Sequence, residues 1–249
     1  DKGKPLLLDE TELSLHPEAQ KRLYQKIVDV SRERQVIVST HSPHFVEWRH
    51  IEKGARVFRV AQDEYGITNI FSPRSETYER ILKFAHLEPK NRKLFDYLAK
   101  EMFFQSSIVF VEGPEDVHIL SMFFEDEGRE QLPWFSYGAG GAGNIRHLLQ
   151  LSVELGLLAV GVYDGNRRDD YNKATAKFMG KEKILCLILE KDDIRDKYKR
   201  DGLCSETGRC KETDDKIIDG YFDRDWNIKP DEKEELLSIL GKAEDHIRS

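Results

Sequence analysis

The chain has 249 residues, enough for one large or two ordinary domains with cores of their own, and we expect two. Its composition, 39% hydrophobic and 34% charged, is typical of a globular protein, and no apolar run is long enough to span a membrane. The formal net charge of −7 argues against a protein that coats nucleic acid through bulk positive charge, and three cysteines without zinc-site spacing indicate a reduced, cytoplasmic protein.

The first forty residues are predicted to form a strand, a helix and a second strand. Apolar runs at 5–8 and 36–39 have the composition of buried strands. Between them, residues 17–33 carry apolar residues at helical spacing, and Pro17 suits the first position of a helix. This order is typical of an α/β domain.

Polar residues that suit nucleotide hydrolysis follow both strands. Asp9 and Glu10 end the first strand, and His41 follows the second. At such strand ends an aspartate can hold magnesium on a nucleotide, a glutamate can polarise the attacking water, and a histidine can touch the terminal phosphate. We therefore predict that these three residues act on ATP.

The same stretch resembles a known ATPase family. Leu-Leu-Leu-Asp-Glu-Thr-Glu-Leu-Ser-Leu-His-Pro at 6–17 is similar to the Walker B segment and D-loop of ABC-type ATPases of the OLD and DNA-repair kind. Ser-Thr-His-Ser-Pro at 39–43 resembles their His switch. Thr11 stands where the family usually has proline and Ser14 where it often has histidine, but neither position carries the phosphate chemistry.

Other parts of an ATPase core are not found in the sequence. There is no G-x-x-x-x-G-K-[ST] phosphate loop, and no Leu-Ser-Gly-Gly-like signature precedes Asp9. We therefore expect ATP binding to need a further ATPase segment, either before residue 1 of a longer natural protein or on another chain.

A hairpin and a helical stretch are predicted next. Short β-runs at 57–60 and 67–71, separated by Asp-Glu-Tyr-Gly, indicate a hairpin that finishes the ATPase sheet. Residues 75–98 are predicted as two helices that part before Pro89. The expected domains are the C-terminal part of an ABC-type ATPase at 1–72, a helical linker at 73–106 and a second domain at 107–249.

Two apolar, strand-length runs in the second domain end abruptly in a carboxylate. Residues 107–111 lead into Glu112, and residues 158–163 lead into Asp164. Ligands gather beyond the carboxyl ends of parallel strands. We therefore expect Glu112 and Asp164 to share one edge of a sheet.

A third acid is expected beside them. Gly113 allows a sharp turn and Pro114 suits the first position of a helix, so Asp116 would come within the first helical turn and could face Glu112. Carboxylates this close repel unless a cation neutralises them, and hard oxygens suit magnesium or manganese. Alternatively, these acids could cap a helix and a turn.

These residues resemble motifs of the Toprim domain, which topoisomerases, primases and OLD-family nucleases share. Glu-Gly-Pro-Glu-Asp at 112–116 looks like its Glu-Gly-x-x-Asp motif, and Asp-Gly-Asn at 164–166 looks like its Asp-x-Asp motif. Asn166 replaces the second aspartate, which removes one negative charge but keeps a carbonyl oxygen, and Asp169 or Asp170 could supply the missing carboxylate. The resemblance implies catalysis by Glu112, Asp116 and Asp164, with magnesium or manganese held by these three residues and Asn166.

The rest of the second domain alternates between helices and strands. A glycine-rich turn at 138–143 could let a phosphate approach backbone N–H groups, or could simply be a tight loop. After the last apolar run, Glu190, Asp192 or Asp193 could serve as a further acidic motif of the family, and Lys191 could steady a phosphate. We expect helices at 117–124, 145–155 and 231–247 and strands at 132–136 and 183–189.

The predicted fold is α/β: the end of an ABC-type ATPase sheet followed by a mostly parallel, Rossmann-like Toprim domain. From Gly165 to Arg200 the chain has eleven Lys or Arg against seven Asp or Glu, which could contact a phosphate backbone or form a solvated helix face. The resemblance implies an OLD-family endonuclease that cleaves DNA under the control of a homo-oligomeric ATPase, often in phage defence. The alternatives are a non-catalytic Toprim regulator and an RNA-directed nuclease.

Overall fold

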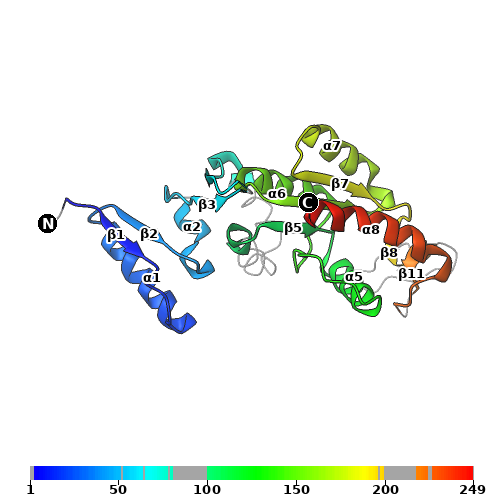
Figure 1. Cartoon of the computed structure of the whole chain (residues 1–249), viewed down its shortest axis with the longest axis horizontal. Helices are drawn as coiled ribbons and strands as arrows, with labels where there is room; N and C mark the ends of the chain where they lie inside the picture. Colours follow the sequence, from blue (N-terminus) through cyan, green and yellow to red (C-terminus); the bar gives the residue numbers. More distant parts are fainter. Residues whose placement is uncertain are drawn as a thin grey trace, which may run out of the picture. The chain divides into compact units, whose positions relative to one another are not determined.

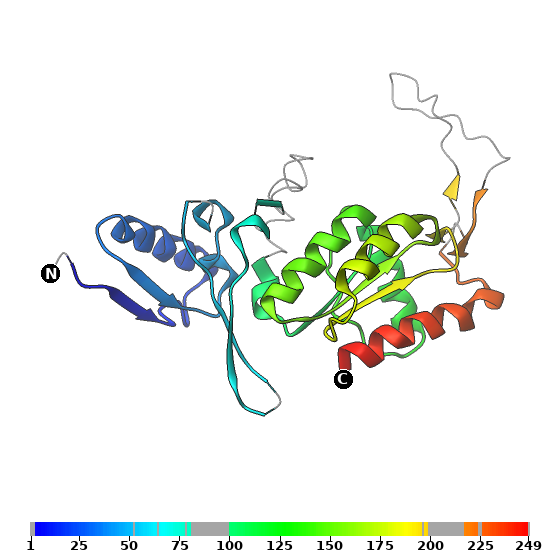
Figure 2. The same cartoon turned by 90° about the horizontal axis from the view of Figure 1, so that it is seen from above.

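The computed structural model describes residues 3–51, 53–63, 65–77, 79–80, 100–195, 197–198, 217–223 and 226–248. The chain divides into two compact units, Asp1–Gln105 (unit 1) and Ser106–Ser249 (unit 2), seen in two orientations in Figure 1 and Figure 2. Both units are α/β, with small, mostly parallel sheets and helices packed on them, as the sequence predicts.

Unit 1 begins with the expected strand, helix and strand. β1 (Leu6–Asp9) pairs in parallel with β2 (Val36–Ser39), and α1 (Pro17–Ser31) connects them. The prediction of fully buried strands was wrong, because alternate side chains are exposed, among them Leu7 at 69% and Ile37 at 52%. Each strand therefore buries one face only, within the part of unit 1 that the structure describes.

The remainder of unit 1 contains a short helix and the expected hairpin. α2 (Trp48–Ile51) is followed by β3 (Arg59–Gln62) and β4 (Thr68–Phe71), which pair antiparallel. The prediction that the hairpin finishes the β1–β2 sheet was wrong for the described residues, because β3 and β4 form a sheet of their own. The two helices predicted at 75–98 lie largely outside the described residues.

Unit 2 is built on a parallel sheet with the order β5–β6–β7. Its strands are β5 (Ser107–Phe110), β6 (Leu158–Tyr163) and β7 (Ile184–Ile188). The strand expected at 132–136 is reduced to a single bridge between Trp134 and Val109. One reason is that Pro133 has no N–H to continue a ladder.

Helices cover both faces of this sheet (Figure 1). α5 (Pro114–Asp126) and α8 (Lys233–Arg248) form an apolar cluster with Val109, Val160 and Val162. α6 (Ala142–Leu155) and α7 (Arg168–Phe178) pack on the other face, where Gly161 makes room for Ile145. No helix in the described part of the chain is long and apolar enough to cross a membrane.

Short strands follow β7. β8 (Asp193–Arg195) pairs in parallel with β11 (Gly220–Phe222), and β9 (Lys197–Tyr198) pairs antiparallel with β10 (Ile217–Ile218). Residues 199–216, which include Cys204 and Cys210, lie outside the described residues.

Candidate functional site

The carboxyl ends of β5, β6 and β7 meet at one edge of the unit 2 sheet, because the three strands are parallel. Glu112 follows β5 and Asp164 follows β6 directly. The backbone N–H of Asp164 donates to Oε1 of Glu112 over 3.4 Å. The structure therefore brings together the two residues at which the Toprim-like motifs begin.

Glu112 is a mostly buried carboxylate with a cation beside it. Its side chain is 13% exposed, and Nε of Arg167 lies 3.4 Å from Oε2. Burial raises the pKa of Glu112 above its ordinary value, the Arg167 guanidinium and the Asp164 N–H oppose that rise, and the Asp193 carboxylate adds to it. The edge thus combines two buried acids with a guanidinium that is half exposed.

Asp116 lies in the first turn of α5, as predicted, and is 6% exposed. Its Oδ2 accepts from the backbone N–H of Gly113 at 2.8 Å. This contact is the helix-capping role that the sequence left open as an alternative.

The residues after Asp164 are more exposed. The 3-10 helix Gly165–Arg167 presents Asn166 to solvent, and Asp169 is exposed in the first turn of α7. Asp170 is half-buried, and its charge acts on Tyr163. The contacts shown for the Glu112 side chain are with Asp164 and Arg167, and none of them involves Asn166, Asp169 or Asp170.

After β7, Asp193 is the buried acid near Glu112, whereas Glu190 and Asp192 are exposed. Nζ of Lys191 pairs with Asp219 at 2.8 Å and with Glu232 at 2.6 Å, which also raise the pKa of Lys191. The ammonium group of Lys191, which the sequence offered as one that could steady a phosphate, is therefore held by two carboxylates. The backbone oxygen of Lys191 accepts from Gly165 N at 2.8 Å and fixes the loop after Asp164.

The glycine-rich turn supports Glu112 from the other side. The N–H of Ala139 donates to the oxygen of Val111, and that of Gly141 to the oxygen of Glu112, each at 2.8 Å. Gly138 lies against the backbone of Gly113, where a Cβ would come within 2.4 Å of the carbonyl carbon. Two N–H groups of this turn, for which the sequence left open a phosphate contact or a tight loop, therefore bind the chain itself.

The donor set suits a hard cation, since Glu112, Asp164 and Asp193 supply carboxylate oxygens. In their present positions, however, the described residues contain no group of three or more His, Cys, Asp or Glu side chains that could hold a metal ion. Metal binding here stays a prediction. Sequence reasoning missed the contact of Arg167 with Glu112. The available signal was that Arg167 follows Asp164 by three residues, which places it within one helical turn of the site.

Unit 1 holds the other predicted residues. Asp9 ends β1, and the backbone N–H of Glu10 donates to Ser39 at 3.0 Å. Nε2 of His41 lies 3.1 Å from Oε1 of Glu10. The structure thus joins the acid and the histidine predicted to act on ATP.

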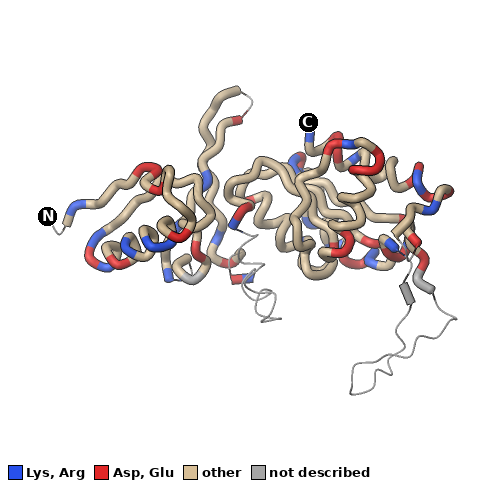
Figure 3. Tube along the Cα trace, turned by 90° about the horizontal axis from the view of Figure 1, so that it is seen from below, with Lys and Arg blue, Asp and Glu red and all other residues tan. Residues whose placement is uncertain are grey.

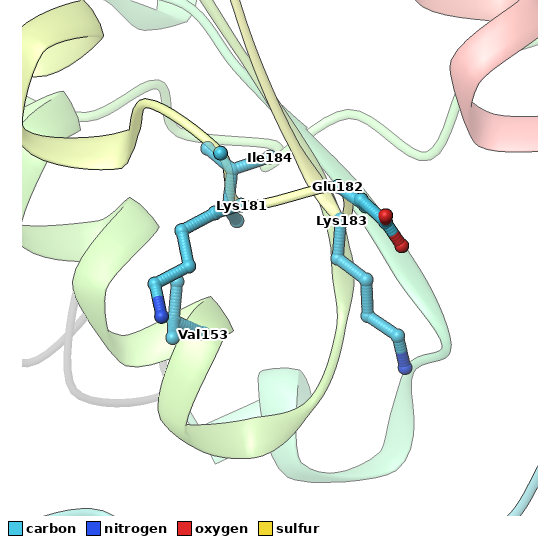
Figure 4. Close-up of a pocket in the computed structure, with 6 residues that line it drawn as sticks. Val153, Lys181, Glu182, Lys183 and Ile184 are labelled. Atoms are coloured by element: carbon cyan, nitrogen blue, oxygen red, sulfur yellow. The ribbon is translucent and has the colours of Figure 1, made fainter.

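A separate hollow lies at the opposite edge of the unit 2 sheet, where β7 begins (Figure 4). Lys181 and Val153 flank it on one side and Lys183 on the other. The chemistry-bearing residues of unit 2 lie at the other ends of the strands, so we assign this hollow no role in the candidate site. The full lining is Val153, Gly180, Lys181, Glu182, Lys183 and Ile184.

Residues 1–47 form a strand, a helix and a strand with an acidic pair and a histidine at the strand ends, an arrangement typical of an AAA- or ABC-like ATPase segment. Residues 1–47 match the family model described as "AAA domain, putative AbiEii toxin, Type IV TA system". No Toprim or OLD-family model matches the chain, and no curated protein matches it.

Proposed function

We propose that unit 2 is a Toprim-like, magnesium- or manganese-dependent nuclease that nicks or cleaves DNA, and that the ATPase segment of unit 1 controls it in phage defence. The observation that carries the proposal is the 3.4 Å approach of Glu112 Oε1 to Asp164 N, which joins two motifs 52 residues apart. The description of the matched family, which names a toxin system, supports a defence role.

The residues of the edge divide the proposed chemistry among them. Glu112 and Asp164 would hold the ion, with Asp193, the buried acid near Glu112, as a third carboxylate. The motif resemblance also assigns Asp116 and Asn166 to the ion, which would polarise the phosphodiester when bound. Alternatively, Glu112 could take a proton from the attacking water, because burial raises its pKa and makes it a stronger base. Arg167 is half exposed and can move from Glu112 to an incoming phosphate.

In unit 1, Asp9 would hold magnesium on ATP, and Glu10 with His41 would act at the terminal phosphate. The phosphate loop would come from a further segment. Basic and acidic residues are interspersed along both units rather than gathered in one stripe (Figure 3), so DNA contact would depend on local groups such as Arg167 and Lys173.

Incubation of supercoiled plasmid with the protein and manganese tests the nuclease. We expect nicking that Glu112→Ala lowers by roughly a hundredfold or more. Glu125→Ala is the matched control, because Glu125 is an exposed acid near the C-terminal end of α5 and has no part in the proposed site. Plasmid that stays supercoiled with every divalent metal would contradict the proposal. Digestion of tRNA but not of plasmid would show that the substrate is RNA.

The second candidate is a non-catalytic regulator that binds metal or nucleic acid without cutting. The observation that favours it is the contact of Arg167 with Glu112, together with an exposed amide, Asn166, in place of the second acid. DNA retention without nicking, in the same assay, would select this function.

A further inference from the structure

Glu12 is buried in a turn whose apolar residues are exposed. It is 4% exposed, whereas Leu13 is 63% and Leu15 37% exposed. The turn also holds two non-glycine residues at positive φ, Glu10 at 44° and Ser14 at 66°, which costs conformational energy. A turn that exposes leucines and buries a carboxylate is organised around that carboxylate.

The buried carboxylate of Glu12 binds the segment that carries His41. Its Oε1 accepts from the hydroxyl of Thr40 and, at 3.1 Å, from the backbone N–H of His41. Its Oε2 is buried and has no hydrogen-bond partner among the described residues. Both hydrogen bonds that the structure shows for the Glu12 side chain are thus made to residues 40–41.

A second set of bonds closes this network through α1. The hydroxyl of Thr40 accepts from Ser42 N at 3.0 Å, and the hydroxyl of Ser42 donates to Gln20 Oε1 at 2.6 Å. Gln20 Nε2 in turn donates to the oxygen of Leu15 at 3.0 Å. The loop after β2 is therefore bound to the turn after β1 at two points.

The contact between His41 and Glu10 is too weak to fix the position of the imidazole. The His41 side chain is 81% exposed and that of Glu10 36% exposed, and exposed pairs contribute little. Buried bonds to a charged acceptor are stronger and directional. The position of His41 must therefore come from its backbone.

We propose that Glu12 is a positioning residue that fixes the His41 backbone and so places the imidazole against Glu10. The inference rests on the proposed ATPase role of unit 1. Glu12 acts in this role through the backbone of residues 40–41.

The test uses the protein with the expected phosphate-loop segment present, whether that segment precedes residue 1 or lies on another chain. For Glu12→Ala we expect kcat for ATP hydrolysis to fall roughly ten- to a hundredfold, with KM for ATP within about twofold. Amide hydrogen exchange at His41, measured by NMR, should quicken roughly tenfold or more. Thr40→Val should move both readouts in the same direction, whereas Thr40→Ser, which keeps the hydroxyl, should restore them.

The matched control is Glu18→Ala, an exposed glutamate on α1 that should leave both readouts unchanged. The inference is overturned if the His41 amide of Glu12→Ala exchanges faster while kcat is unchanged. It is also overturned if kcat falls while exchange at His41 is unchanged. If the unsubstituted protein hydrolyses no ATP, the proposed ATPase role fails, while the exchange data still decide whether Glu12 holds His41.

Discussion

At the scale of single residues, Glu112 is costly to the fold. Burial disfavours its charged form, and the carboxylate of Asp193 adds to that cost, while Arg167 offsets part of it. A carboxylate retained under these conditions is typical of a functional group, because structural sites seldom keep an acid that raises the free energy of the folded state.

Replacing Glu112 by Gln should stabilise the metal-free protein at neutral pH. The pKa of Glu112 is raised above 4.5 in the folded state, so the unfolded state releases its proton first as the pH rises. Stability is therefore lost from about the unfolded pKa upwards, until the folded state has also ionised. Glutamine does not titrate and escapes this loss.

Urea unfolding in EDTA at pH 7 and at pH 4 measures the effect. The advantage of Glu112→Gln should be present at pH 7 and shrink at pH 4, where the glutamate in both states carries its proton more often. Glu125→Gln, on the exposed side of α5, should change stability by less than about 0.5 kcal/mol. An equal gain at both pH values would show that burial of charge is not the cause.

At the scale of elements, the turn that contains Gly138 is the support of the site. Gly138 and Gly128 have the same φ of +63°, but only Gly138 has a neighbour, the Gly113 backbone, within reach of an added Cβ. Gly138→Ala should therefore cost both the strain of positive φ and the displacement of Gly113.

Gly128→Ala should lower the free energy of unfolding by about 1 kcal/mol, because only the backbone strain is added. Gly138→Ala should lower it by at least about 2 kcal/mol more, and urea unfolding of both variants measures the difference. Because the two glycines have the same φ, the difference between the two losses of stability measures the contact of Gly138 with the Gly113 backbone. Equal costs for the two substitutions would mean that the turn moves away from Gly113 freely.

The elements also show how far sequence reasoning reaches. The parallel strands of unit 2 were predictable because β5, β6 and β7 are apolar runs bounded by polar residues. The packing of Gly138 on Gly113 was not, since it joins turns 25 residues apart whose glycines had separate local explanations.

The same limit applies to the candidate site. Strand-end position identified Glu112 and Asp164 as neighbours, because every parallel strand ends at the same edge. The direction of a long side chain is set by partners that lie far away in sequence. Lys191, bound by Asp219 and Glu232, and Asp193, close to Glu112, could not be told apart from their neighbours by pattern alone.

At the scale of the whole molecule, the two units differ in the apolar surface they bury. In the described part of unit 1, few large side chains are buried, among them Trp48 and Phe103, and Leu7, Ile37 and Ile70 are more than half exposed. Unit 2 has a continuous core between its sheet, α5 and α8. Since buried apolar area is the main source of stability, unit 2 should be the more stable of the two.

We therefore expect the chain to unfold in two steps, with unit 1 first. Trp48, 3% exposed, reports on unit 1, whereas Trp134 and Trp226 report on unit 2. The double variant Trp134→Phe/Trp226→Phe keeps only Trp48, and Trp48→Phe keeps only the two tryptophans of unit 2. The fluorescence of the double variant should have a urea midpoint about 1 M or more below that of Trp48→Phe. Coincident midpoints would show that the units unfold as one.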